Sequence, residues 1–251
     1  MTRPSLIAGN WKMNGMLADA RALAKAIAGG HRPAAGNRSD VVLCPPAPLL
    51  LAVGEALAGS AVALGGQDCH AKPSGAFTGD VSARLLADIG CRYVIVGHSE
   101  RRTLHGESDA TVRAKAEAAL AAGLIAIICV GETLAEREAG ATASVLERQI
   151  DGSVPAAAAA ATTVVAYEPV WAIGTGKVAT TAQVAEAHGG LRRRLARNHA
   201  DGGEFRLLYG GSVKPDNAGE LLALPDVDGA LVGGASLDAG QFLAIVAAAR
   251  G

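Results

Sequence analysis

Eight short runs of apolar residues recur along the chain, and a longer segment of helical character follows each of them. Such runs are apolar on both faces, as parallel strands must be when both sides of the sheet are buried. The runs are Leu6–Ala8, Val41–Cys44, Ala61–Leu64, Tyr93–Val96, Ile125–Cys129, Val164–Tyr167, Leu207–Tyr209 and Gly229–Val232. Helical segments such as Asp19–Ala28, Asp109–Ala121 and Ala182–Asn198 separate them. The chain is therefore predicted to alternate strand and helix eight times.

The length of the chain decides which α/β fold these units form. Eight strand–helix units in 251 residues match a closed (β/α)8 barrel, which typically takes about 250 residues. An open, doubly wound sheet is the alternative, and it predicts a Gly-x-Gly-x-x-Gly turn after an early strand. No such turn occurs, and no stretch has the composition of a linker. We expect residues 1–251 to form a single barrel domain of eight parallel strands, each followed by a helix.

Composition and charge exclude several classes of partner. Hydrophobic residues make up 50% of the chain and aromatic residues only 3%, so aliphatic side chains must build the core. The formal net charge of −1 argues against nucleic acid and anionic membranes, because both select a basic surface. No stretch has the length of a membrane span or the apolar core of a secretory signal. The four cysteines show no Cys-x-x-Cys spacing, and we expect a cytoplasmic protein with reduced thiols.

Polar residues follow three of the predicted strands at their carboxyl ends, where barrels place their chemistry. Asn10 and Lys12 follow the first run, His98 follows the fourth and Glu168 follows the sixth. Taken singly, Lys12 is typical of a solvated surface lysine and His98 of a hydrogen-bonded structural histidine. Because all of these strand ends meet at one rim of a barrel, we interpret the residues together as a candidate site.

Two glycine-rich turns end the seventh and eighth strands at the same rim. They are Gly210-Gly211-Ser212 and Gly233-Gly234. Loops at these positions of a barrel often bind phosphate through backbone N–H groups. Glycine lets the backbone approach the anion without a Cβ atom in the way. Tight turns without a ligand are the simpler interpretation of each pair, but the two positions together favour a phosphate site.

The segment after Glu168 has the features of a lid that closes over a substrate. Pro169 fixes the backbone at its start, Gly174 and Gly176 give freedom near its end, and Trp171 is unusually apolar for a loop. A closed lid would exclude water and desolvate the Glu168 carboxylate, which raises its pKa. The predicted lid consists of Pro169, Val170, Trp171, Ala172, Ile173, Gly174, Thr175, Gly176 and Lys177.

Mechanisms that use a metal or a covalent nucleophile lack their motifs. His98-Ser99-Glu100 has the His-x-Glu spacing of the zinc nucleobase deaminases, but the Pro-Cys-x-x-Cys segment that completes such a site is absent. No Gly-x-Ser-x-Gly elbow occurs either. We therefore expect neither a metal nor a cofactor.

Seven strings spread from the first strand to the last resemble the motifs of the triosephosphate isomerase family. They are Gly9-Asn10-Trp11-Lys12-Met13-Asn14, Gly75-Ala76-Phe77-Thr78-Gly79, Gly97-His98-Ser99-Glu100-Arg101-Arg102, Cys129-Val130-Gly131-Glu132, the ten residues 167–176, Tyr209-Gly210-Gly211-Ser212-Val213 and the nine residues 228–236. The resemblance covers essentially the whole chain. It implies a TIM barrel that interconverts dihydroxyacetone phosphate and D-glyceraldehyde 3-phosphate by proton transfer through an enediol(ate) intermediate, in glycolysis and gluconeogenesis.

The resemblance also implies a role for each candidate residue. Glu168 corresponds to the base, and His98 to the neutral imidazole that hydrogen-bonds the enediolate oxygens. Lys12 corresponds to the cation that offsets negative charge, Asn10 helps to orient it and the substrate, and Glu100 is a second acid nearby. The phosphate-binding amides of the family correspond to Gly174, Ser212, Gly233 and Gly234, and the latch of its closed lid to Tyr209, Ser212 and Ala179.

The segment from Gln67 to Gly79 resembles the interface loop of the family and implies a homodimer. Thr78 corresponds to the residue that reaches the region of Lys12 in the other subunit. Gln67 and Asp68 are expected at the same interface.

Two other functions are weighed against this one. A different phosphate-binding barrel enzyme, of the indole-pathway or pentose-phosphate epimerase type, explains the glycine turns but not the lid after Glu168. A catalytically silent barrel that serves as a binding or structural protein would be expected to lack Lys12, His98 or Glu168, and all three are present.

Overall fold

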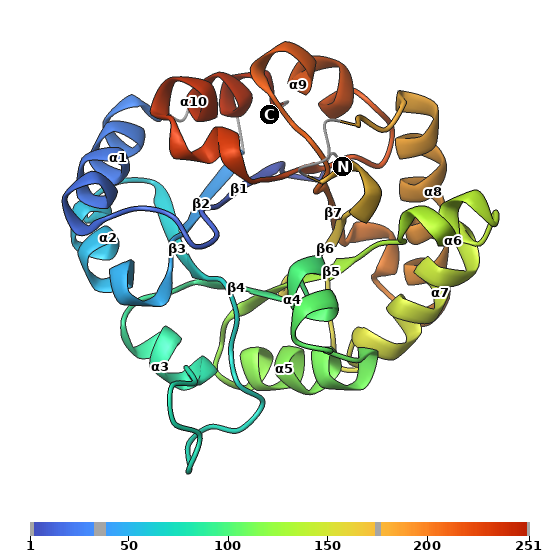
Figure 1. Cartoon of the computed structure of the whole chain (residues 1–251), viewed down its shortest axis with the longest axis horizontal. Coiled ribbons are helices and arrows are strands. Elements are labelled where there is room, and N and C mark those ends of the chain that lie inside the picture. The colour runs from blue at the N-terminus through green and yellow to red at the C-terminus, as the bar shows by residue number, and fades with distance from the viewer. Residues whose placement is uncertain (1–2, 33–38, 174–176, 250–251) are drawn as a thin grey trace.

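Eight parallel strands close into a barrel in this computed structural model, which describes residues 3–32, 39–173 and 177–249 (Figure 1). The strands pair in chain order, and the last pairs back with the first. They are β1 Leu6–Asn10, β2 Asp40–Cys44, β3 Val62–Gly66, β4 Tyr93–Val96, β5 Ile125–Val130, β6 Thr163–Tyr167, β7 Arg206–Tyr209 and β8 Gly229–Val232. The barrel confirms the predicted fold class, and each strand overlaps one of the eight apolar runs.

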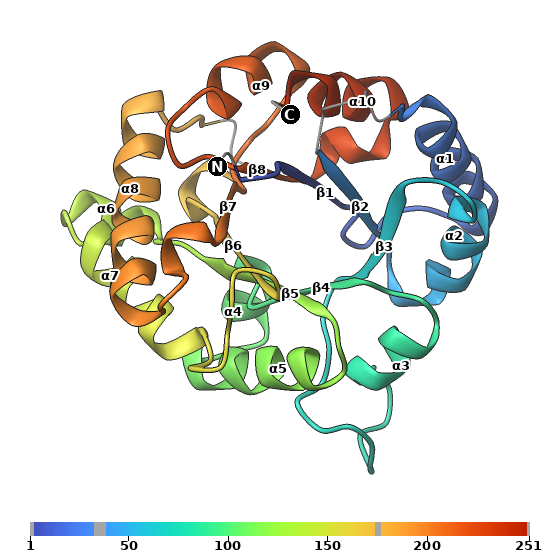
Figure 2. The ribbon, with the colours of Figure 1, turned by 180° about the vertical axis from the view of Figure 1, so that it is seen from behind.

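Helices form a ring outside the barrel (Figures 1 and 2). They are α1 Leu17–Gly30, α2 Leu50–Leu57, α3 Ala83–Asp88, α4 Ser99–Leu104, α5 Asp109–Ala121, α6 Leu134–Glu138, α7 Thr142–Ser153, α8 Thr181–Asn198, α9 Pro215–Leu222 and α10 Ala239–Ala248. Local signals explain where some of them begin. The Ser108 side chain accepts a hydrogen bond from the Thr111 amide at the start of α5, and Thr180 and Gln183 form a capping box at the start of α8.

The strands bury both faces, and successive residues alternate between two hydrophobic layers. Leu6 and Ala8 of β1 pack inside the barrel, whereas Ile7 packs between the barrel and its helices. Cys44 and Cys129 also lie in the inner layer. All four cysteines are buried free thiols, and burial raises the pKa of Cys69 and of Cys91 to about 12. Within the described residues, every helix is too short or too polar to cross a bilayer.

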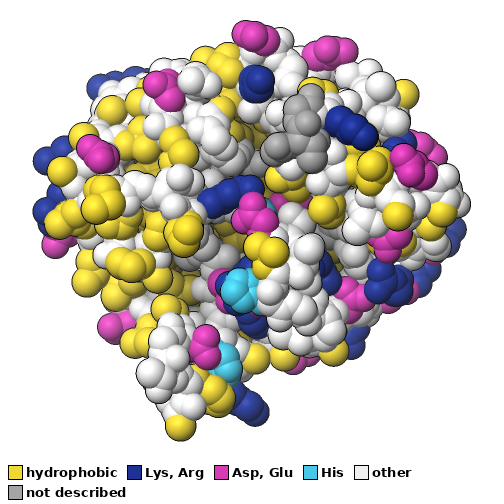
Figure 3. All heavy atoms as spheres, in the orientation of Figure 1, with side chains coloured by type: hydrophobic (Ala, Val, Ile, Leu, Met, Phe, Trp, Pro, Cys, Tyr) yellow, Lys and Arg dark blue, Asp and Glu magenta, His cyan; other side chains and the backbone are white. Residues whose placement is uncertain are grey.

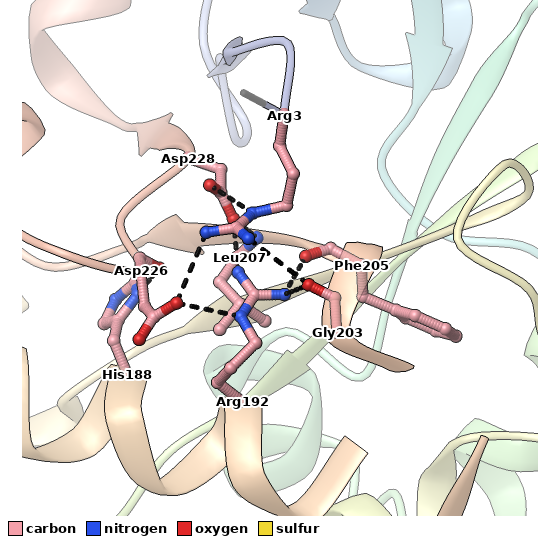
Figure 4. A network of polar contacts seen from close by, with 8 residues as sticks. All are labelled: Arg3, His188, Arg192, Gly203, Phe205, Leu207, Asp226 and Asp228. Atoms are coloured by element: carbon pink, nitrogen blue, oxygen red, sulfur yellow. Dashed lines mark hydrogen bonds and ion pairs between the residues drawn. The ribbon is translucent and has the colours of Figure 1, made fainter. Parts of the chain in front are cut away.

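Charged side chains form a network of ion pairs and hydrogen bonds where β7, β8 and β1 begin (Figure 4). Asp228 accepts hydrogen bonds from Arg3 at 2.8 Å and from Arg192 at 2.6 Å, and Asp226 accepts one from Arg192 at 3.0 Å. His188 of α8 is fully buried beside them, and burial lowers its pKa to about 4. Because this cluster lies at the amino ends of the strands, we assign it to stability rather than to the chemistry of the opposite rim.

A long loop between β3 and α3 projects away from the barrel in both ribbon views (Figures 1 and 2). It contains Gln67 and Asp68 at its base and Thr78 among its exposed residues. The base of the loop is therefore attached to the barrel through Gln67, and its outer part is a surface feature.

Candidate active site

A cavity of about 450 Å³ opens at the carboxyl ends of the strands. Figure 3 shows the hollow near the centre of this face, with basic and acidic side chains beside it. Seven of the predicted catalytic and substrate-binding residues line it: Asn10, Lys12, His98, Glu168, Ser212, Gly233 and Gly234. They follow five different strands, so the barrel brings together residues that are up to 224 positions apart in the sequence.

Glu168 lies at the end of β6 with a side chain that is only 2% exposed. Its Oε1 atom is 2.8 Å from His98 Nε2, and its Oε2 atom accepts a hydrogen bond of 2.9 Å from the Ser99 amide. Burial raises the pKa of this carboxyl, but the charge and hydrogen bond of His98 and the Ser99 amide outweigh burial and hold the pKa below its usual value. In this position the carboxylate is stabilised and is therefore a weaker base.

His98 follows β4 and stands directly before α4, where its side chain caps the helix. Its Nδ1 atom accepts a hydrogen bond of 3.2 Å from the Glu100 amide, so Nδ1 carries no proton. The imidazole can then be neutral with its proton on Nε2, the atom that faces Glu168. Burial lowers the pKa of His98, and the adjacent Glu168 carboxylate more than reverses this and raises it.

Lys12 has a left-handed backbone with φ of 52°, which is uncommon for a residue with a side chain. Three groups hold it in place. Its amide donates to Asn10 Oδ1 at 3.0 Å, its carbonyl accepts from Gln67 Nε2 at 2.8 Å, and its Nζ atom lies 2.5 Å from Glu100 Oε1. Strained backbone of this kind persists only where its surroundings fix it, which is typical of functional sites.

The first of the two glycine-rich turns approaches neighbouring side chains closely. A Cβ atom on Gly211 would lie 2.2 Å from Tyr209 Oη, and one on Gly210 would lie 2.8 Å from Glu168 Cγ. Gly233 and Gly234 begin a 3-10 helix, Gly234–Leu237, where N–H groups have no partner within the helix. These amides at the cavity wall are suited to an anion.

The first part of the predicted lid packs on Glu132, a buried carboxylate that follows β5. Its Oε1 atom accepts hydrogen bonds from Trp171 Nε1 at 2.9 Å and from Tyr167 Oη at 3.1 Å. Val170–Ala172 form a 3-10 helix, and Ile173 lines the cavity. The Ala179 amide lies near the Tyr209 hydroxyl, but among the described residues this buried hydroxyl has no hydrogen-bond partner, and burial raises its pKa to about 12. Gly174, Thr175 and Gly176 lie outside the described residues.

The other candidate residues lie away from the cavity wall. Glu100 pairs with Lys12, and Asp68 forms ion pairs with Lys115 at 2.7 Å and with Arg101 at 2.9 Å. Sequence reasoning missed the Ser99 amide that binds Glu168, the contact of Gln67 with the Lys12 carbonyl, and the part that Glu132 plays under Trp171. It also missed Lys214, which lines the cavity two residues after Ser212 of the first glycine turn.

Comparisons with known proteins agree with this site. The sequence profile of the family described as "Triosephosphate isomerase" matches residues 5–249. The triosephosphate isomerase of Afipia carboxidovorans is 60% identical over 97% of this chain and 96% of its own length, and that of Chelativorans sp. is 60% identical over 98% and 97%. A crystal structure of triosephosphate isomerase from Bartonella henselae superposes with a TM-score of 0.89 at 48% identity, over 97% of this chain and 98% of that one. The chain therefore belongs to the triosephosphate isomerase family.

Proposed function

We propose that Glu168, His98 and Lys12 carry out the reaction of this family in the cavity at the carboxyl ends of the strands. The reaction itself follows from membership of the family: the enzyme is an isomerase that interconverts dihydroxyacetone phosphate and D-glyceraldehyde 3-phosphate in glycolysis. The observation that carries the assignment of residues is the meeting of a buried carboxylate, an imidazole, a lysine and two glycine turns at one cavity.

Glu168 is proposed as the base that removes a proton from carbon 1 of the substrate and returns one at carbon 2. The carboxylate must leave the Ser99 amide and His98 to reach a substrate carbon. Those two contacts lower its pKa, so losing them while it remains buried makes it a stronger base. Glu168 thus becomes a stronger base when it moves to the substrate, which is when it has to remove a proton.

His98 is proposed to donate a hydrogen bond from its Nε2–H group to the substrate oxygens as negative charge develops on them. When Glu168 moves away, Nε2 is free to face the substrate, and the Glu100 amide keeps Nδ1 unprotonated. Lys12, held by Asn10 and Gln67, adds a positive charge at the same place. Glu100 is proposed to orient Lys12 through their ion pair.

The phosphate of the substrate is proposed to bind the amides of Ser212, Gly233 and Gly234, with Gly174 joining them from the lid. The lid, from Pro169 to Lys177, would close over the phosphate and exclude water from the enediolate. The buried Tyr209 hydroxyl lies near the Ala179 amide and has no hydrogen-bond partner among the described residues, which supports the proposal of a latch just beyond the lid.

A coupled assay tests the function directly. Purified protein is incubated with D-glyceraldehyde 3-phosphate, NADH and a dehydrogenase that reduces dihydroxyacetone phosphate. We expect NADH to be oxidised as dihydroxyacetone phosphate forms. The buffer contains a metal chelator, and no cofactor is added for the isomerase itself. The same preparation with His98 replaced by glutamine serves as the control for contaminating isomerase. Absence of NADH oxidation with the wild-type protein would favour a catalytically silent barrel.

The enzyme is also proposed to be a cytoplasmic homodimer whose interface includes Gln67, Asp68 and Thr78. Large apolar side chains are exposed beside the projecting loop and on α1 and α2, and Figure 3 shows hydrophobic side chains gathered over these two helices. They are Met13, Met16, Leu17, Leu51, Phe77 and Leu85. Met13, next to Lys12, is 94% exposed, and exposed apolar side chains that gather on one face mark a protein–protein interaction surface. Thr78 would then reach the region of Lys12 in the other subunit.

Sedimentation velocity should give the mass of two chains at micromolar concentration. Replacing Met13 and Leu51 by glutamate should shift the protein towards the mass of one chain, because burying a carboxylate in an apolar interface is costly. Changing the exposed Leu104 to glutamate on α4 is the matched control outside the proposed interface. A wild-type monomer with full activity would contradict the interface.

A further inference from the structure

Arg102 of α4 lies outside the cavity lining and has no role in the function described so far. Its guanidinium is 14% exposed and forms an ion pair of 2.7 Å with Asp109, at the start of α5. Its remaining hydrogen bonds go to two carbonyls at the rim of the barrel and to Ser153 at the end of α7. Nε donates to the Gly97 carbonyl at 2.9 Å, and Nη2 donates to the Cys129 carbonyl at 3.0 Å and to Ser153 Oγ at 2.9 Å.

The two carbonyls that Arg102 binds are those of the first residues beyond the β4–β5 ladder. The register of that ladder ends with Val96 opposite Ile128, so Gly97 and Cys129 would be the next pair. Gly97 instead turns with φ of 67°, and a Cβ atom there would lie 2.6 Å from a Val112 methyl group. Arg102 therefore connects β5 to the turn after β4 by side-chain hydrogen bonds, at the point where the pairing of the two strands stops.

Each of these two residues lies next to a reacting group, either along the chain or through strand pairing. Gly97 is the residue before His98, and Cys129 pairs with Ala166 of β6, the strand that ends directly before Glu168. The separation of His98 Nε2 and Glu168 Oε1, 2.8 Å in this structure, depends on how far β4 and β6 are spread on either side of β5. A guanidinium can hold several acceptors in a fixed planar geometry, which an ammonium group cannot do.

We propose that Arg102 is a positioning residue for the isomerase reaction: by binding the carbonyls of Gly97 and Cys129 together, it fixes the placement of His98 relative to Glu168. The inference rests on the proposed function of those two residues. It assigns to Arg102 no contact with the substrate. Its partner Asp109, which also binds Arg148 at 3.2 Å, holds the guanidinium in place.

The test is Arg102→Lys, which keeps the positive charge beside Asp109 but cannot serve all of the acceptors. We expect kcat to fall by about tenfold or more, because misplacing a reacting group by about 1 Å costs up to about a hundredfold. KM and the inhibition constant of inorganic phosphate should stay within about twofold of wild type, since the phosphate-binding turns follow β7 and β8. A purely structural role would leave kcat of the folded protein unchanged.

Arg206→Lys is the matched control. Like Arg102, Arg206 is a largely buried arginine with an aspartate partner, here Asp40 at 2.8 Å. It lies in β7, at the opposite end of the barrel. Both variants should lower the thermal unfolding midpoint, and only Arg102→Lys should lower kcat. Equal kcat values for the two variants would overturn the proposal.

Asp109→Asn covers the case in which Arg102→Lys does not fold. It keeps an acceptor for Arg102 but weakens the ion pair, and we expect kcat to fall by about two- to fivefold with the phosphate inhibition constant unchanged. Wild-type kcat in this variant would also overturn the proposal. An inactive wild-type enzyme would instead refute the proposed function, so the two failures are distinguishable.

Discussion

Replacing Glu168 by glutamine should lower kcat by about a thousandfold, because a positioned general base contributes about 10²- to 10⁴-fold and glutamine cannot accept the proton. The amide has nearly the same shape as the carboxyl, so Oε1 of glutamine can still accept the hydrogen bond from the Ser99 amide. Binding of the phosphate should change little, since its proposed partners are backbone amides. The measurement is the coupled assay at saturating substrate, with the inhibition constant of inorganic phosphate as a check on the cavity.

The control for this variant is Glu186→Gln, the same chemical change at an exposed position of α8. It should leave kcat unchanged and so exclude an effect of net charge. Glu168→Gln should also stay folded, because removing a buried negative charge removes its desolvation cost along with its contacts. A variant that is folded, binds phosphate and turns over at the wild-type rate would rule out Glu168 as the base.

The fold could be predicted from the sequence because strands buried on both faces leave a simple signal. The apolar run Tyr93–Val96 coincides with β4, and the prediction for α5 has the observed bounds. The third strand is shifted, from the predicted Ala61–Leu64 to Val62–Gly66. Glycines do not favour strands, but a Cβ atom on Gly65 would lie 2.7 Å from Cys44 Sγ, so close packing inside the barrel explains its presence there.

The site was only partly predictable, for a physical reason. The rule that chemistry follows the strand ends located Lys12, His98 and Glu168, since it needs only the order of elements along the chain. The contacts that hold those residues come from side chains that reach across the rim. Gln67 binds the carbonyl of Lys12, which is 55 positions away in the sequence. The residues on either side of Gln67 do not indicate that its side chain makes this contact. Such contacts depend on the packed geometry, which pattern and spacing do not specify.

Replacing Lys12 by methionine should lower kcat/KM by about 10²-fold or more, because the lysine is proposed to stabilise negative charge that develops on the substrate oxygens. Methionine keeps much of the length of the side chain and removes only the charge. Its backbone can adopt the same conformation, since the groups that fix it, Asn10 and Gln67, bind the Lys12 amide and carbonyl. The loss should therefore be electrostatic and should grow at low ionic strength, where charges are screened least.

The thermal stability of Lys12→Met distinguishes an electrostatic role of Lys12 in the reaction from a structural role. Lys12 and Glu100 are 29% and 45% exposed, and ion pairs at that exposure contribute less than about 1 kcal/mol. Lys12→Met should thus leave the thermal unfolding midpoint within a few degrees of wild type while activity is lost. Lys25→Met on the exposed face of α1 is the matched control and should change neither. If Lys12→Met instead unfolded the protein, the lysine would be supporting the strained turn after β1 and not the developing charge. The electrostatic role would then have to be sought in Lys214, which also lines the cavity.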